Sequence, residues 1–318
     1  MKKVCLDLTE SRGLGDTICA TPIVRKLYET YGYKIAVITQ HPEVFQRNPY
    51  VSELYFPDTT DFNVIIEKYT VFNSFHKPNH EDCRGIVPHH NVMDLRQFHA
   101  TNLGFMLSDY EMSMDYVPRE FEPIEGLPER FVLIHPVTTW ASRTWSEQRW
   151  LTLTTLLNES GIAVVSVGKD SSEVGYSNVQ KPVFNFPISL GLNLLNQTDL
   201  SQTWWLMNKS LCFITMDSGL LHLAGTTDSH ILQLGSSVKP DFRAPYRNNT
   251  QSYKYDYVSG SCNIFCASDL KYAVKEWGTI NSVPSLVNCL EKKPTFECHP
   301  NVIDVFNKIM KITENYAI

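Results

Sequence analysis

Short apolar runs alternate with longer amphipathic stretches along the chain, and this alternation predicts its secondary structure. The apolar runs have strand length and end at polar or turn-forming residues, which indicates strands buried on both faces. The stretches between them carry apolar residues at helical spacing. The predicted strands span residues 4–8, 35–39, 64–66, 131–135, 162–167, 211–214 and 230–234, and a further short strand ends at residue 55. The predicted helices span residues 17–31, 95–106, 145–160, 200–209, 220–225 and 302–316.

Strands and helices alternate in both halves of the chain, which predicts an α/β fold with two parallel-sheet domains facing one another. The length of 318 residues, about twice that of a typical domain, agrees with two domains. The best linker candidate is Val117–Arg130, which combines three prolines and a glycine with charged residues. We therefore expect domains at residues 1–125 and 126–318, with the final helix packing back on the first domain.

Composition limits the class of protein. Hydrophobic residues make up 43% of the chain, but no run approaches the roughly 18–20 residues of a membrane span, so we expect at most peripheral membrane association. The first apolar run contains charges and is therefore a strand rather than a signal peptide. A net charge of −6, without a Lys/Arg-rich block, argues against a nucleic-acid partner. Eight cysteines in a chain without a secretory signal indicate a reducing compartment, so we expect a cytoplasmic protein, which includes one bound at the inner face of the membrane.

The stretch 215–224 (TMDSGLLHLA) carries the densest candidate chemistry. It joins a predicted strand to a predicted helix, so Asp217, Ser218 and Gly219 lie at the carboxyl end of a parallel strand, where open α/β sheets bind ligands. The N–H groups of a helix start favour a phosphate, and Gly219 permits close approach. Ser218 and His222 share one helix face. The plain alternative is an aspartate that caps the helix and a histidine that packs in the core.

A glycine turn after the first strand holds a second candidate. Gly13 and Gly15 precede Asp16, which lies at a predicted helix start, where the helix dipole keeps a carboxylate ionised. The turn follows a strand, as in dinucleotide-binding folds, but the third glycine of that fingerprint is Ile18 here. The second strand ends in Thr39 instead of the acidic residue that holds a ribose. Asp16 therefore suits a catalytic base or a simple helix cap better than a nicotinamide site.

Five of the ten histidines fall between residues 72 and 102. His76 and His80 have the spacing of a helical metal site, but Pro78 between them opposes a helix. We interpret this region as loops beside an acceptor site, with a metal site as the weaker alternative. The five histidines are His76, His80, His89, His90 and His99.

Three groups of residues, in order along the chain, resemble glycosyltransferase family 9, the ADP-heptose heptosyltransferases of lipopolysaccharide core synthesis. The first group is the Gly-Leu-Gly-Asp turn at 13–16, followed by Thr-Pro at 21–22 and Asn-Pro-x-Val at 48–51. The second is IHPVTTWASRTW at 134–145, and the third is MDSGLLHLA at 216–224. The resemblance implies a GT-B fold, in which two Rossmann-like domains hold the active site in the cleft between them.

The resemblance also implies roles for individual residues. Asp16 would be the general base, and Arg143, where the family usually has Lys, would neutralise the departing nucleotide. Asp217 would grip the donor sugar, and His222 would support the diphosphate site. The diphosphate itself would be held by Thr138, Thr139, Ser218 and Gly219. Such a transfer needs no cofactor for its chemistry. The plain alternatives are a capping role for Asp16, a surface position for Arg143 and ordinary loop positions for the two threonines.

The α/β pattern stops at Ser259, and the segment 259–299 is rich in cysteine. Two thiols four residues apart and two further along could form a tetrahedral site for Zn or Fe as a structural metal. Free thiols and disulfides remain open alternatives. The resemblance is relevant here as well, since autotransporter heptosyltransferases carry an iron-binding finger in this region. The four residues are Cys262, Cys266, Cys289 and Cys298.

The sequence thus favours an inverting glycosyltransferase that uses a nucleotide-diphospho-sugar, with ADP-heptose as the expected donor. A nucleotide-sugar epimerase on the same two-domain plan is the alternative from a different enzyme class. A binding protein that has lost transfer ranks last, because Asp16 is present. The expected acceptor is a lipopolysaccharide-core sugar, another glycan or a protein Ser/Thr hydroxyl.

Overall fold

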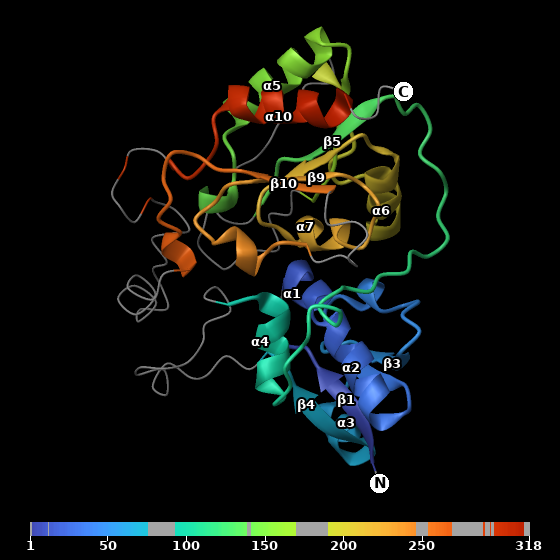
Figure 1. Cartoon of the computed structure of the whole chain (residues 1–318). Helices are drawn as coiled ribbons and strands as arrows, with labels where there is room; N and C mark the ends of the chain where they lie inside the picture. The colour runs from blue at the N-terminus through green and yellow to red at the C-terminus, as the bar shows by residue number, and fades with distance from the viewer. Residues whose placement is uncertain are drawn as a thin grey trace.

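The computed structural model describes residues 2–11, 13–75, 93–138, 141–169, 190–245, 254–268, 289, 293 and 296–314. Its elements form two α/β halves, one above the other in Figure 1. The first half contains β1 Lys3–Asp7, α1 Leu14–Cys19, α2 Thr21–Tyr31, β2 Ile35–Ile38, the 3₁₀ turn η1 Pro42–Val44, β3 Val51–Tyr55, α3 Phe62–Lys68, β4 Tyr69–Asn73 and α4 Leu95–Asn102. The second contains β5 Phe131–His135, η2 Ala141–Arg143, α5 Glu147–Glu159, β6 Ala163–Ser166, β7 Leu192–Asn193, α6 Leu200–Lys209, β8 Phe213–Thr215, α7 Gly219–Ala224, β9 Ile231–Leu234, η4 Pro240–Phe242, β10 Tyr255–Val258, η6 Cys266–Ser268 and α10 Val302–Glu314.

The described strands form two sheets in which every pairing is parallel. The first sheet has the order β3-β2-β1-β4, and the second has the order β10-β9-β8-β5-β6-β7. The central strands β2, β5, β8 and β9 are buried along their whole length, as expected for parallel strands covered by helices on both faces. The predicted α/β fold with two parallel sheets is therefore confirmed.

Three predictions for the first half need correction. The helix predicted at 95–106 is shorter, because α4 ends at Asn102. The predicted strand at 64–66 lies inside helix α3, because the Asp61 side chain caps this helix through the Asn63 N–H at 2.9 Å, and the sheet strand follows at β4. The predicted helix at 17–31 begins earlier and divides at Ala20 into α1 and α2. Pro22 stands in the first turn of α2, where its missing N–H costs little. The division makes α1 a short helix with its own ends.

The second half follows the prediction closely. Strand β5 and helix α6 match it at both ends. Helix α5 begins after Ser146, whose side chain accepts from the Arg149 N–H, and Gly161 follows its end with a φ of +76°, as a C-terminal glycine does. The short strands β7 and β10 were not predicted. They extend the two edges of the sheet.

The final helix α10 packs differently from the expectation. Its buried residues Val305, Ile309 and Ile312 join the hydrophobic cluster of the second half, which also contains Trp150 and Leu153 of α5. Figure 1 shows α10 beside α5, at the end of the molecule far from β1. The amphipathic pattern predicted a buried stripe correctly, but the stripe covers the second half instead of the first.

The connection between the halves is an extended segment that runs along the outside of the molecule (Figure 1). Arg25 on α2 holds its beginning through the Asp115 carboxylate and the carbonyl of Ser113. Further along, the Tyr116 hydroxyl lies 2.9 Å from the hydroxyl of Ser201 on α6. These bonds attach the segment to both halves.

Candidate active site

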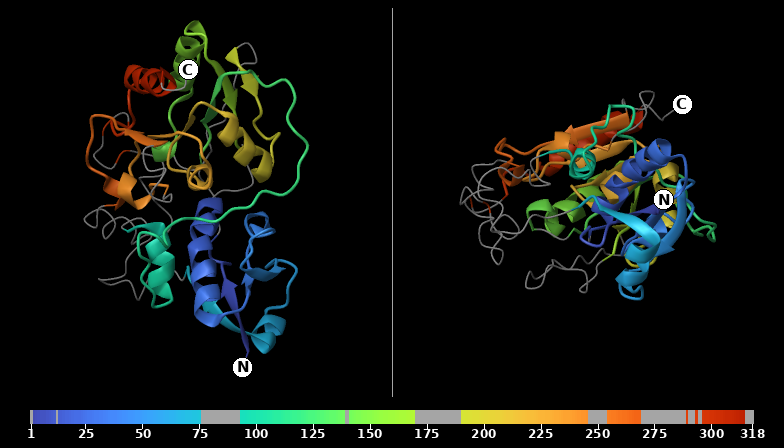
Figure 2. Two further views of the ribbon diagram at one scale, coloured as in Figure 1. Left: turned by 45° about the vertical axis from the view of Figure 1, so that its right-hand side comes forward. Right: turned by 90° about the horizontal axis from the view of Figure 1, so that it is seen from below.

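The two halves meet where α1 faces α7, as Figure 1 and the left view of Figure 2 show. Two glycines permit this approach. A Cβ added at Gly15 would lie 3.1 Å from the Gly219 Cα, and one added at Gly219 would lie 3.0 Å from the Gly15 nitrogen. Side chains at these positions would push the two helix starts apart. Asp16, the residue after Gly15, therefore lies beside the turn at 217–219, as a shared site requires.

Asp16 lies in the first turn of α1, and Gly13 is the N-cap residue of this helix. Its carboxylate lies over Gly13, since a Cβ added there would be 2.9 Å from Oδ2. Its backbone carbonyl lies 3.0 Å from Nε2 of His99 on α4. Gly13 and Gly15 therefore have separate steric roles: Gly13 leaves room for the Asp16 carboxylate, and Gly15 leaves room for α7.

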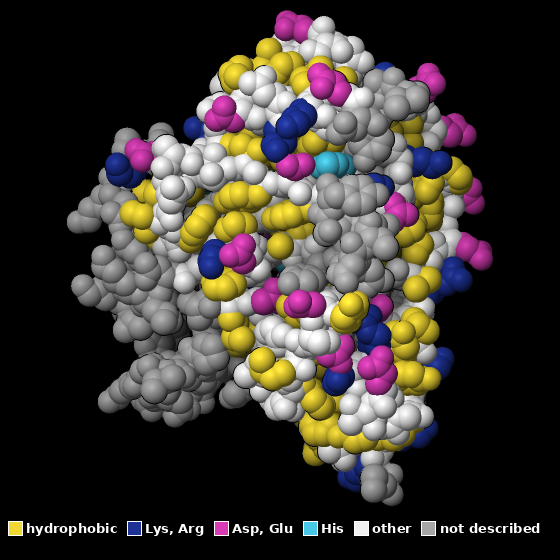
Figure 3. Space-filling model, viewed as in Figure 1, with side chains coloured by type: hydrophobic (Ala, Val, Ile, Leu, Met, Phe, Trp, Pro, Cys, Tyr) yellow, Lys and Arg dark blue, Asp and Glu magenta, His cyan; other side chains and the backbone are white. Residues whose placement is uncertain are grey.

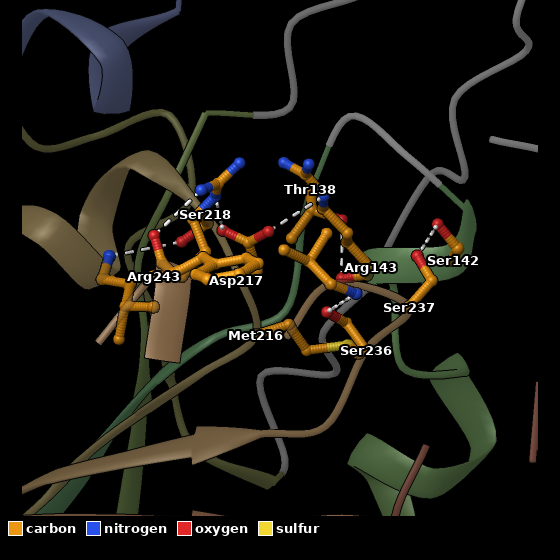
Figure 4. Close-up of polar contacts among 12 residues, drawn as sticks. Thr138, Ser142, Arg143, Met216, Asp217, Ser218, Ser236, Ser237 and Arg243 are labelled. Atoms are coloured by element: carbon orange, nitrogen blue, oxygen red, sulfur yellow. Dashed lines mark hydrogen bonds and ion pairs between the residues drawn. The ribbon is translucent and has the colours of Figure 1, made fainter. Parts of the chain in front are cut away.

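Asp217 lies between two arginines (Figure 4). Its Oδ2 is 3.1 Å from Nε of Arg143, and its Oδ1 is 3.7 Å from Nε of Arg243. The Asp217 side chain is 2% exposed, and those of Arg143 and Arg243 are 15% and 3% exposed. Arg143 was predicted as a site residue, whereas Arg243 was not. One carboxylate thus holds two guanidinium groups at the turn before α7.

Arg243 also contacts the first half. Its Nη1 donates to the carbonyl of Phe242 at 2.9 Å and lies 3.5 Å from the carbonyl of Met93, just before α4. Arg243 therefore links the Asp217 turn to the other half of the molecule. No local pattern marks this residue, because it follows a 3₁₀ turn in a segment without a recognisable motif.

The Ser218 side chain is part of a buried network. Its oxygen accepts from the Leu221 N–H at 3.4 Å, which caps α7. It also lies 3.1 Å from Nδ1 of His135 and 3.1 Å from the Thr215 hydroxyl. Burial lowers the pKa of His135 to about 4, so this imidazole is neutral at pH 7. The network fixes the turn that joins β8 to α7.

His222 lies inside α7 and is 2% exposed. Burial lowers the pKa of its imidazole well below the usual range, and the positive charges of Arg96, Arg243 and Arg143 lower it further. Its Nδ1 is buried and has no hydrogen-bond partner among the described residues. His222 is thus a buried, neutral imidazole whose pKa is affected by three guanidinium groups, and its Nδ1 has no partner among the described residues.

The loop before α5 carries Thr138 and Arg143. The Thr138 hydroxyl donates to the carbonyl of Arg143 at 2.8 Å and lies 2.6 Å from the Thr144 hydroxyl, so it closes the loop on itself. The carbonyl of Ser142 lies 2.8 Å from Nε2 of His299, near the end of the cysteine-rich segment. Thr139, the other predicted threonine, lies outside the described residues.

The cysteine-rich segment lies beside the end of β10. The Gly260 N–H donates to the carbonyl of Cys298 at 2.9 Å, and the Cys262 N–H donates to the carbonyl of Glu297 at 3.1 Å. Burial raises the pKa of the Cys298 thiol to about 12, with further contributions from Cys266, Cys262 and Cys289. Within the described ranges, no three or more His, Cys, Asp or Glu side chains form a ready metal shell.

The structure describes some of the remaining cysteines and histidines and not others. Cys5, Cys19 and Cys212 are fully buried and their pKa values are raised by burial, as expected for core residues. Of the five histidines between residues 72 and 102, His99 is described and is buried on α4. The positions outside the described residues are Cys83, His76, His80, His89 and His90.

The surface shows no concentration of basic charge on the described part of the face in Figure 3. Lys and Arg side chains are interspersed with Asp and Glu over both halves. Among the described helices, none has both the length and the apolar character that crossing a membrane demands.

Each half of the molecule has a parallel β-sheet covered by helices, and the two halves meet at helix starts. This architecture is that of GT-B proteins. The family model for glycosyltransferase family 9 (heptosyltransferase) matches residues 88–263, more than half of the chain. The chain therefore belongs to glycosyltransferase family 9. No curated protein sequence matches it at a significant level.

Solved structures of this family share the fold. The family 9 glycosyltransferase of Veillonella parvula is 15% identical, with a TM-score of 0.62 over 99% of this chain and 96% of its own. The dodecameric iron-containing heptosyltransferase TibC of enterotoxigenic E. coli, in complex with ADP-D-β-D-heptose, is 15% identical, with a TM-score of 0.70 over 99% of this chain and 78% of its own. The E. coli ADP-heptose lipopolysaccharide heptosyltransferase II is 16% identical, with a TM-score of 0.56 over 83% and 92%.

Proposed function

We propose that this protein is an inverting glycosyltransferase that transfers a heptose from ADP-heptose to an acceptor hydroxyl. The approach of Asp16 on α1 to the turn where Asp217 holds two guanidinium groups carries the proposal. Membership of a heptosyltransferase family supports the choice of sugar. The complex of the related TibC with ADP-D-β-D-heptose supports the choice of nucleotide.

The proposed reaction is a single displacement. The acceptor oxygen forms a bond to the anomeric carbon while the bond from that carbon to the diphosphate oxygen breaks, so the configuration inverts. Asp16 takes the hydroxyl proton as general base. Arg143 and Arg243 neutralise the charge that builds on the departing ADP, because guanidinium groups fit pairs of phosphate oxygens. The proposed chemistry uses only these side chains.

The donor would be held by the second half, residues 126–318, and the acceptor by the first, residues 1–125. In this proposal the N–H groups around Ser218 and Gly219 face the diphosphate, and Nδ1 of His222 supplies a hydrogen bond to it. A neutral imidazole can donate one N–H without adding a cation to the three guanidinium groups nearby. Thr138 shapes the loop that carries Arg143, and its neighbour Thr139 completes the predicted diphosphate set.

We propose the acceptor only as a chemical class: a hydroxyl of a lipopolysaccharide-core sugar, of another glycan or of a protein Ser/Thr. An epimerase remains the second enzyme class. It would need acid and base groups around one sugar carbon, whereas Asp16 comes from the half opposite the turn at 217–219. This placement favours transfer over epimerisation.

A ligand panel tests the proposed donor. ADP and ADP-heptose are expected to raise the melting temperature, because a ligand that binds only the folded protein stabilises it, whereas UDP and GDP should not. Mixtures of ADP-heptose with each acceptor class should then release ADP only with the correct acceptor. Conversion of ADP-heptose to its epimer without any acceptor would support the epimerase instead. A panel in which no adenine nucleotide raised the melting temperature would overturn the donor assignment.

We also propose that Cys262, Cys266, Cys289 and Cys298 bind one structural Zn or Fe ion in a cytoplasmic protein. The contributions of Cys266, Cys262 and Cys289 to the raised pKa of the Cys298 thiol support this set. Thiolates are the ligands that tetrahedral Zn and Fe sites use. TibC, described as iron-containing, supports Fe in particular. Such an ion would fasten the segment that ends at His299 to the loop of Arg143.

Metal analysis of the purified protein tests this second proposal. We expect about one Zn or Fe per chain, and its loss in Cys266→Ser together with a lower melting temperature, because a structural metal contributes directly to folding. Cys212→Ala is the matched control, since Cys212 is a buried core cysteine outside the set. It should keep its metal. A metal-free protein with unchanged stability would refute the proposal.

A further inference from the structure

Both ring nitrogens of His99 are hydrogen bonded in the interior of the first half. Nε2 lies 3.0 Å from the backbone carbonyl oxygen of Asp16, and Nδ1 lies 2.9 Å from the hydroxyl of Ser74, just after β4. A carbonyl oxygen can only accept, so Nε2 carries the proton and Nδ1 accepts from the Ser74 hydroxyl. Ser74 therefore fixes the tautomer that His99 needs in order to donate to Asp16.

The carbonyl of Asp16 lies in a short helix, where a donor from another element can reach it. In a longer helix, the N–H four residues further along would bond to it. Here that N–H belongs to Ala20, at the point where the chain turns into α2. The Ala20 N–H donates instead to the carbonyl of Thr17 at 3.2 Å. The Asp16 carbonyl thus lies among the last carbonyls of a six-residue helix, which require partners from outside. His99 supplies one from α4.

The donor is held rigidly. His99 is fully buried, and burial lowers its pKa to about 4, so it stays neutral at pH 7. Its ring packs against Phe75 with a centroid distance of 5.1 Å. Asn102, at the end of α4, donates to the carbonyl of Ser74 at 2.9 Å, which joins α4 and the end of β4 a second time. The imidazole therefore has little freedom to move relative to α1.

We propose that His99 is a positioning residue for the proposed general base: it fixes α1 to α4 and so sets where the Asp16 carboxylate lies. The inference rests on the proposed role of Asp16. Gly15 of α1 packs against Gly219 of α7, and the carbonyl of Asp16 is bonded to His99 of α4. A helix held at these two points keeps its carboxylate in place for proton transfer. Losing one of the two supports would let α1 shift, and misplacement by about 1 Å can cost about 100-fold in rate.

Transfer kinetics of His99 variants test the proposal. His99→Leu is expected to lower kcat by about 10- to 100-fold while the Kd for ADP changes less than about twofold, because the donor side is untouched. His99→Gln should recover most of the rate, since its amide N–H can reach the Asp16 carbonyl. In a double-mutant cycle, His99→Leu should cost nothing further in an Asp16→Asn background, because both changes act through the same carboxylate.

The controls separate positioning from general stability. Phe98→Leu, on the same helix and buried against Phe75, should lower the melting temperature with kcat within about twofold. If His99→Leu does not fold, Ser74→Ala gives the milder test, with a smaller loss of kcat, since it frees the tautomer. Additive losses in the cycle, or a normal kcat in both His99→Leu and Ser74→Ala, would overturn the proposal. A normal rate in Asp16→Asn alone would instead overturn the proposed function.

Discussion

Asp16→Asn is expected to lower the rate of transfer by about 10²–10⁴-fold, the usual contribution of a positioned general base. The amide keeps the size of the side chain, so it should still fit over Gly13 and leave α1 in place. It cannot take the acceptor proton. The Kd for ADP should be nearly unchanged, because the proposed diphosphate contacts come from the second half. Initial rates of ADP release and calorimetric titration with ADP measure the two quantities.

The matched control is Asp61→Asn. Asp61 is also an acidic residue at a short helix start in the first half, where its side chain accepts from the Asn63 N–H at 2.9 Å. Asparagine is as good a cap as aspartate, so α3 should keep its start in this variant. Transfer by Asp61→Asn should be normal. If Asp16→Asn transferred sugar as fast as this control, Asp16 would not be the base.

The fold was predictable where the signals are local. Helix α6 begins at a capping box formed by Asp199 and Gln202, and strand β5 is an unbroken apolar run, so both have ends that the sequence marks. The segment around residues 64–66 shows the opposite case. Its apolar run favoured a strand, but the Asp61 cap makes it a helix with Ile65 as its one buried residue. Where two local signals compete, the capping residue has to be weighed as well.

Packing partners were less predictable than elements. The stripe of Val305, Ile309 and Ile312 predicts that α10 covers something apolar, but an amphipathic stripe does not say which surface it covers. The apolar surface beside α5 in the second half provides that partner. The four cysteines are similar, because their spacing predicts a set of donors but not how these are arranged in space.

The candidate site likewise contains some residues that the sequence locates and others that it does not. Asp16 and the turn at 217–219 each follow a strand and open a helix, so the sequence alone locates them at sheet edges. Arg243 and His99 have no such signal, since each comes from an element distant in sequence and acts on a residue of another element. A histidine on the apolar face of a helix, beside Phe98, is the one hint for His99, because a buried imidazole needs partners for both nitrogens.

Asp217→Asn is expected to reduce the free energy of unfolding of the ligand-free protein by about 3–5 kcal/mol, because it takes the buried carboxylate away from the buried Arg243 and the partly buried Arg143. Urea unfolding measures this loss. ADP should then raise the melting temperature of the variant more than that of the wild type, since its diphosphate restores negative charge beside Arg143 and Arg243. The control Asp199→Asn removes an exposed ion pair with Arg119 and keeps a good helix cap, so it should change stability only slightly.

The same variant distinguishes the two roles that Asp217 can have. If Asp217 mainly holds the arginines, Asp217→Asn should change the affinities for ADP and for ADP-heptose by the same factor, because both ligands present the same diphosphate. If it mainly grips the donor sugar, as the family resemblance implies, only the affinity for ADP-heptose should fall. The geometry favours the first outcome, because each carboxylate oxygen already faces a guanidinium group and the side chain is 2% exposed. A loss confined to ADP-heptose, with unchanged stability of the ligand-free protein, would return Asp217 to the sugar.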